Sequence, residues 1–90
     1  MTKKIKLKSL FPSDSAMTRK HIAFGVSSFR EKVVEFNQKL EISSIEMEMI
    51  SVDEKIAVIK LRGKRRLINE FLVTLSTNPI YTQFYGWEAL

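Results

Sequence analysis

The residues best suited to binding chemistry are five cations in the stretch KLRGKRRL, residues 60–67. They are Lys60, Arg62, Lys64, Arg65 and Arg66. We expect them to span the end of a strand and the first turn of a helix, where each cation opposes the helix dipole by about 0.3–1 kcal/mol. Helix stability does not explain them, whereas an anion would, because free backbone N–H groups at a helix start attract phosphate. The alternative is that these long side chains only cover apolar surface and keep their charged heads in water.

Catalytic chemistry has little support in the sequence. His21 is the only histidine, there is no cysteine, and Asp14 and Asp53 are the only aspartates, so no spacing indicates a Ser-His-Asp arrangement. Glu46 and Glu48 would stand about 7 Å apart on one strand face, a range at which two carboxylates do acid–base work. A solvated strand face, with cross-strand lysine partners, is the better explanation of the two glutamates. We therefore predict no catalytic residue and a protein that is not an enzyme.

Metal and nucleotide sites are also unsupported. His21 and the distant carboxylates lack the ligand spacing of a zinc site. Gly63-Lys64 is followed by Arg65 and lacks the upstream glycine of a phosphate-binding loop. We predict neither a metal nor a cofactor.

Size and charge limit the class of protein. The chain of 90 residues is long enough for one domain, and its net charge of +5 favours anionic partners. The absence of cysteine fits a reducing compartment. No apolar run reaches the roughly 18 residues that cross a bilayer, and the first residues lack the apolar block of a signal peptide. We expect a cytoplasmic protein without a membrane partner.

The first half of the chain allows two interpretations. Residues 1–18 are expected to form a basic N-terminal arm, in which KIKLKSL alternates like a half-buried strand and FPSDS ends it. Residues 20–27 are then expected to form a strand and residues 28–41 a helix, because Gly25 disfavours a helix and Ser28 with Glu31 makes a capping box. The alternative is one helix from Ser15 to Leu40, since apolar residues at positions 22, 26, 29, 33, 36 and 40 share its face.

The second half predicts a hairpin, a helix and a last strand. Residues 43–51 alternate before the turn VDEK, and residues 56–62 after it form a nearly continuous apolar run typical of a central strand. Residues 63–79 carry a helical apolar stripe, and residues 80–87 suit a strand. The expected order β-α-β-β-α-β predicts an α+β, ferredoxin-like domain over residues 19–90. Its four-stranded antiparallel sheet would carry both helices on one face, and the arm could add a strand.

Residues 21–87 resemble the small ACT-like regulatory domains. In particular, LRGKRRLINEFLVTLSTNPIYTQFYGW is similar to their last strand–helix–strand unit, which also ends some magnesium-stress membrane proteins. The resemblance implies a ligand- or partner-sensing module that dimerises. The chain departs from the amino-acid-binding members, because its turn after the expected first strand reads Val26-Ser27-Ser28 and contains no glycine.

The open face of the expected sheet is the predicted interaction surface. It would hold Val58, Lys60 and Arg62 on one central strand, Arg19 and His21 on the other, and the aromatic residues Tyr81, Tyr85 and Trp87 on the last strand. Aromatic residues and arginine are enriched in the cores of protein interfaces, so the first hypothesis is a regulatory or assembly module that homodimerises or binds another protein through this face. The second is a nucleic-acid-binding accessory protein that uses the cations of residues 60–66, because single-stranded nucleic acid binds where rings lie beside a basic groove.

Overall fold

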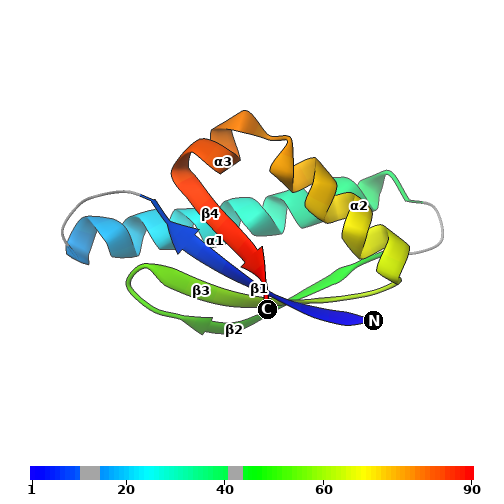
Figure 1. The fold of residues 1–90 in the computed structure, drawn as a ribbon, viewed down its shortest axis with the longest axis horizontal. Helices are drawn as coiled ribbons and strands as arrows, with labels where there is room; N and C mark the ends of the chain where they lie inside the picture. Colours follow the sequence, from blue (N-terminus) through cyan, green and yellow to red (C-terminus); the bar gives the residue numbers. More distant parts are fainter. Residues whose placement is uncertain (11–14, 41–43) are drawn as a thin grey trace.

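A computed structural model describes residues 1–10, 15–40 and 44–90, with the backbone alone for residues 15–18 and 79–81. Four strands and three helices follow one another along this part of the chain (Figure 1). Their bounds are β1 Thr2–Ser9, α1 Ser15–Gln38, β2 Glu46–Val52, β3 Ile56–Arg62, α2 Arg65–Ser76, α3 Pro79–Phe84 and β4 Tyr85–Ala89.

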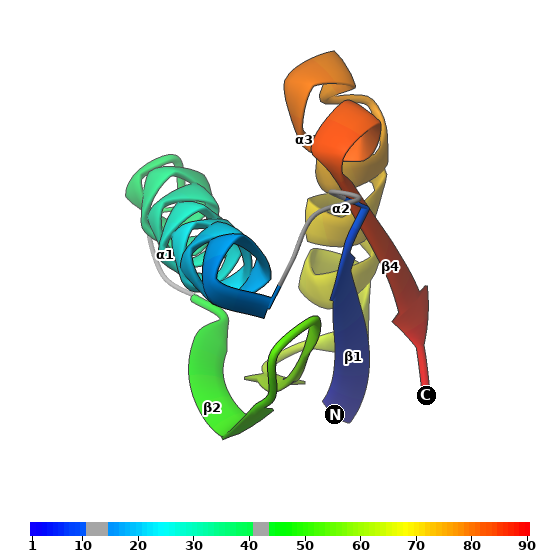
Figure 2. The ribbon, with the colours of Figure 1, turned by 90° about the vertical axis from the view of Figure 1, so that its left-hand side faces the viewer.

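The strands form one antiparallel sheet in the order β2-β3-β1-β4. The described helices lie on one side of this sheet, with α1 over the β2 side and α2 and α3 over the β4 side (Figure 2). The α+β class, the four antiparallel strands and the open sheet face are therefore confirmed.

The main correction concerns residues 2–9, which were expected in an N-terminal arm. They form β1, a central strand that pairs with β3 on one side and β4 on the other. The alternation of the sequence explains its stability, because Ile5 and Leu7 are fully buried while Lys4, Lys6 and Lys8 point to the opposite face. The chain thus keeps the predicted β-α-β-β-α-β order except for the added helix α3 before β4, and β1 replaces the strand expected at residues 20–27.

A single helix, α1, occupies the region where we predicted a strand and a shorter helix, so that prediction was wrong. Ser28 and Glu31 lie inside α1 and form no capping box at a helix start. The apolar stripe decides for the helix, since Ile22, Phe29 and Val33 are buried against the sheet.

Position 25 of α1 is a glycine, and another side chain occupies the space that a Cβ would need there. A Cβ on Gly25 would lie 2.8 Å from Cζ of Tyr85, which approaches from β4. The cost of about 1 kcal/mol for glycine in a helix is therefore offset by the close packing of the tyrosine ring. Gly25 marks a packing site and does not end the helix.

The C-terminal half follows its pattern more closely. The hairpin of β2 and β3 is confirmed, with a bulge between Met49 and Ser51, and so is α2. In the core, Phe71 of α2 makes edge-to-face contacts with Phe29 and Phe36 of α1 at ring-centroid distances of 5.4 and 5.6 Å. The strand predicted at residues 80–87 was wrong in its first half, where α3 replaces it before the short β4.

Candidate functional site

The open sheet face gathers five cations on its two central strands. Alternation on β3 buries Ala57, Ile59 and Leu61 under the helices and directs Val58, Lys60 and Arg62 to the opposite face, as predicted. The β1–β3 register places Lys4 directly across from Lys60, and Lys6 across from Val58. We call Lys4, Lys6, Lys8, Lys60 and Arg62 the basic face.

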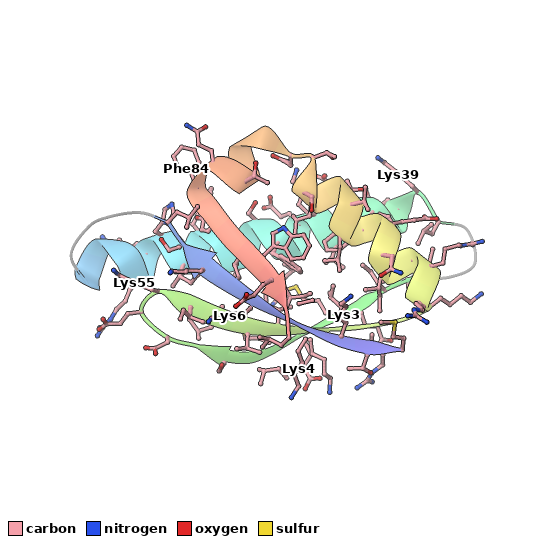
Figure 3. The ribbon with its side chains drawn as sticks, in the orientation of Figure 1. Lys3, Lys4, Lys6, Lys39, Lys55 and Phe84 are labelled. Carbon is pink, nitrogen blue, oxygen red and sulfur yellow. The ribbon has the colours of Figure 1, made fainter. Side chains whose placement is uncertain are left out.

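The start of α2 adjoins one end of the basic face. The backbone N–H of Gly63 donates to the carbonyl of Met1 at 3.0 Å, which holds the first residue of the chain beside the strand–helix turn. Gly63 has φ 158°, and a Cβ there would lie 3.1 Å from Cγ2 of Ile45, so this tight passage favours glycine. Figure 3 shows Lys4 on the side of the sheet that faces away from the helices.

The three remaining predicted cations form that helix start. Lys64 is the N-cap and makes no side-chain capping hydrogen bond, and Arg65 and Arg66 occupy the first turn, which has no acidic residue. All three are exposed. We call Lys64, Arg65 and Arg66 the α2 start; the structure brings it together with Lys60 and Arg62, as the sequence indicated.

Glutamates neutralise only part of this charge. On the outer strands, Glu48 and Glu46 of β2 approach Lys60 and Arg62 at 3.2 and 3.8 Å, and Glu88 of β4 approaches Lys6 at 3.6 Å. Arg66 pairs with Glu70 on α2 at 3.8 Å. Within the described part of the chain, four cations of the two groups have no ion-pair partner: Lys4, Lys8, Lys64 and Arg65. The surface is therefore basic in the middle and acidic at both sheet edges.

Arg19 and His21 do not lie on the basic face, because α1 carries them on the helix side of the sheet. Arg19 pairs with Glu54 in the β2–β3 turn at 2.7 Å. His21 stacks on Tyr85 with ring centroids 4.5 Å apart, and its Nδ1 lies 2.5 Å from the Ser9 hydroxyl. Their prediction as open-face residues was wrong because it depended on a strand at residues 20–27.

The Ser9–His21 contact resembles half of a catalytic dyad, but its setting is structural. A nucleophilic serine must reach a substrate, and Ser9 is only 3% exposed. The Tyr85 hydroxyl donates to the His21 carbonyl at 2.7 Å, so the cluster joins β1, α1 and β4. Burial lowers the pKa of His21 from its ordinary 6.5 and raises the pKa of Tyr85.

The predicted aromatic patch is absent from the described part of the open face. Tyr85 pairs with Ser9 and Trp87 with Leu7, so both belong to the helix side by register, and Tyr85 is buried. The side chain of Tyr81 lies outside the described residues. Trp87 packs partly against the core and also borders a hollow of about 290 Å³ that it shares with Lys6 and Lys8 at the β4 edge.

Lysines of β1 are the site residues that the sequence prediction missed. Lys4, Lys6 and Lys8 were recognised as one side of an alternating strand, but that strand was assigned to an arm. No signal within residues 2–9 shows that they take a central place in the sheet. Recognising residues 2–9 as the first strand of the sheet required the knowledge that residues 20–27 belong to α1, because β1 is then the only candidate left.

The described residues were also compared with what a metal site and a membrane span require. Among the described residues, no group of three or more histidines, aspartates and glutamates lies close enough to hold a metal ion. None of the helices described here combines the length and apolar character that a membrane span requires.

Comparison with known proteins gives a fold and no family. No family model matches the chain, and no curated protein matches it. Among solved structures, it is similar to the de novo designed protein Foldit4, with a TM-score of 0.58 and 8% identity over 99% of this chain and 91% of that one. It is also similar to the de novo designed protein Ferredog-Diesel, with a TM-score of 0.53 and 12% identity over 100% of this chain and 84% of that one. At these identities the likeness shows the shared fold alone, and the ACT-like resemblance stays a prediction.

Proposed function

We propose that this protein is a non-enzymatic nucleic-acid-binding module that contacts the phosphate backbone through the basic face and the α2 start. The observation that carries the proposal is a set of cations that no described acid neutralises: Lys4, Lys8, Lys64 and Arg65. Lys4 and Lys60 stand directly opposite each other, and like charges in that position destabilise a sheet. The cations of the α2 start oppose the helix dipole. A bound polyanion would remove both costs.

The spacing of the lysines also supports a linear polyanion. Alternate residues on β1 place Lys4, Lys6 and Lys8 in a row at intervals of about 7 Å. The residues that share this face by register include no aromatic side chain in the described part of the chain, and Trp87 only borders it. Base stacking therefore has little surface, so binding should depend on phosphate and be largely independent of sequence.

A ferredoxin-like arrangement is the finer description of the fold that we propose. Both central strands, β1 and β3, come first in their βα units, and the strand order 2-3-1-4 supports this arrangement, with α3 as an addition before β4. RNA-recognition domains with this topology use their open sheet face, although they stack bases on aromatic residues of the central strands. This chain has lysines there, which is why we propose backbone contact.

A homodimeric regulatory or assembly module is the competing proposal, and it has less support. Its predicted aromatic contacts, Tyr85 and Trp87, lie on the helix side by register. Two copies stacked face to face about a two-fold axis would also bring one basic centre against the other, which is repulsive. The competing proposal predicts a dimer in solution that persists at high protein concentration.

Fluorescence anisotropy of labelled single-stranded and duplex oligonucleotides, titrated at several salt concentrations, tests the proposal. If the four cations without partners each contact a phosphate, the slope of log K against log salt is about −3 for single strands and steeper for duplex. The double variant Lys4→Glu, Lys8→Glu should abolish measurable binding. The control is Lys39→Glu, which makes the same charge change at one site on the helix side of the molecule (Figure 3). It should leave the slope of log K against log salt unchanged.

Two outcomes would contradict the proposal. One is no binding at about 50 mM salt, where phosphate contacts are strong. The other is binding that the Lys4 and Lys8 variant leaves intact. Light scattering on the same samples separates the alternative, because a stable dimer without nucleic-acid affinity would favour the assembly module.

A further inference from the structure

A cavity between α1 and α2 is the strongest feature that the proposed function leaves unexplained. It has a volume of about 210 Å³ and is lined from both helices. Its position on the helix side separates it from the basic face, and it does not depend on nucleic-acid binding. Figure 2 shows α1 and α2 apart from each other above the sheet, and the cavity lies between them.

The floor and one wall of this cavity are apolar. Phe71 and Leu75 of α2 are buried and form the floor, and Phe36 of α1 is partly buried and forms the wall. Phe36 packs edge-to-face on Phe71. Phenylalanine rings in this arrangement leave faces and edges that accept a further ring in an offset or edge-to-face contact.

The rim of the cavity is positively charged. Lys32 and Glu35 border it from α1, and Lys39 borders it from the turn directly after that helix. Lys32 pairs with Glu35 at 3.5 Å, whereas Lys39 has no ion-pair partner among the described residues. Among the acids that the structure describes, none pairs with this lysine beside the apolar recess.

A second hollow extends the cavity along α2. It has a volume of about 550 Å³, shares Phe36 and Thr74 with the first, and includes Val73, which is 64% exposed. Arg66 of the α2 start, paired with Glu70, lines its far end, so only the first cavity is separate from the proposed nucleic-acid surface. Because they share Phe36 and Thr74, we call the two hollows together the groove between α1 and α2. Small-molecule sites combine such apolar walls with a few polar groups that orient the ligand.

We propose that this groove binds a small aromatic carboxylate, with its ring against Phe36, Phe71 and Leu75 and its carboxylate toward Lys39. The ring covers the partly buried Phe36 and lies over Phe71 and Leu75, which are almost fully buried, so Phe36 supplies most of the apolar contact. The carboxylate finds the one cation at the rim that no described acid neutralises. An exposed charge pair of this kind distinguishes an acid from its neutral analogue by about two- to fivefold in affinity.

Titration of the ¹⁵N-labelled protein with indole-3-acetate and with indole-3-acetamide tests this site. The amide is a matched neutral probe, so the pair isolates the carboxylate. We expect amide shifts in the last turns of α1 and along α2, and tighter binding of the acid. Lys39→Glu should erase the preference for the acid while the amide still binds.

A second variant keeps the test independent of charge. Thr74 is exposed and lines both hollows, so Thr74→Trp should fill the groove without disturbing the core and should block both probes. Lys4→Glu, which alters the basic face, should change neither affinity. Three results would overturn the proposal: no shifts at millimolar probe, equal affinity for acid and amide, or acid binding that Lys4→Glu removes and Lys39→Glu leaves intact.

Discussion

Replacing Lys4 with glutamate should stabilise the fold while weakening nucleic-acid binding. Lys4 faces Lys60 across the central β1–β3 pair, and directly opposed like charges cost about 0.2–1 kcal/mol, while opposite charges gain a similar amount. Lys60 already has Glu48 at 3.2 Å, which takes part of this gain. We expect a net stabilisation of about 0.5–1 kcal/mol, or roughly 2–8 °C in Tm for a domain of this size.

Thermal unfolding followed by circular dichroism measures this effect. At about 0.01 M salt Lys4→Glu should melt above the wild type and Lys4→Gln between the two, and at about 1 M salt the differences should shrink because salt screens exposed charges. A Lys4→Glu protein that melts at or below the wild-type temperature at low salt would refute the placement of Lys4 opposite Lys60. If Lys4→Glu raises Tm and also weakens nucleic-acid binding, Lys4 serves a binding partner; if it lowers Tm, Lys4 serves the fold.

Three further predictions follow from the packing and the charges. Gly25→Ala should lower the free energy of unfolding by about 1–3 kcal/mol, because its Cβ overpacks the buried ring of Tyr85. Gly86→Ala should be neutral or stabilising, because its Cβ would meet its nearest atom at 3.6 Å. Denaturant unfolding of both variants checks these two values. Burial lowers the pKa of His21 in the folded protein, so the contribution of His21 to stability should be complete above its unfolded pKa of 6.5 and fall as pH drops through the folded pKa. His21→Gln should flatten the dependence of the unfolding free energy on pH in this range. A pH dependence that His21→Gln leaves unchanged would contradict the burial of His21. Arg65→Ala with Arg66→Ala should weaken oligonucleotide binding and reduce the salt slope, yet leave Tm equal or higher because both cations oppose the helix dipole.

Local pattern was sufficient for the elements whose partners lie nearby in the sequence. The hairpin of β2 and β3 and the helix α2 could be predicted because alternation and a helical stripe are each complete within them. The helix α1 could not, because Gly25 is a helix breaker by propensity and only its contact with Tyr85, a residue of β4, accounts for it. A short-range signal was therefore overridden by a long-range contact.

The site was predictable to the same extent as the strands that carry it. Lys60, Arg62 and the α2 start were found because one strand–helix turn holds them together. Arg19 and His21 were misplaced with the strand at residues 20–27, and Tyr85 and Trp87 were assigned to the wrong face. Their orientation depends on the β1–β4 register, and β1 had not been recognised as the neighbour of β4.

The proposed function requires that a polyanion binds the open sheet face. The most direct measurement is the amide shift map of the ¹⁵N-labelled protein with a short single-stranded oligonucleotide at low salt. We predict that the shifted residues lie in β1, in β3 and in the first turn of α2, and that they return to their free positions as salt is raised. Shifts confined to α1 and α3, or no shifts at all, would contradict the claim.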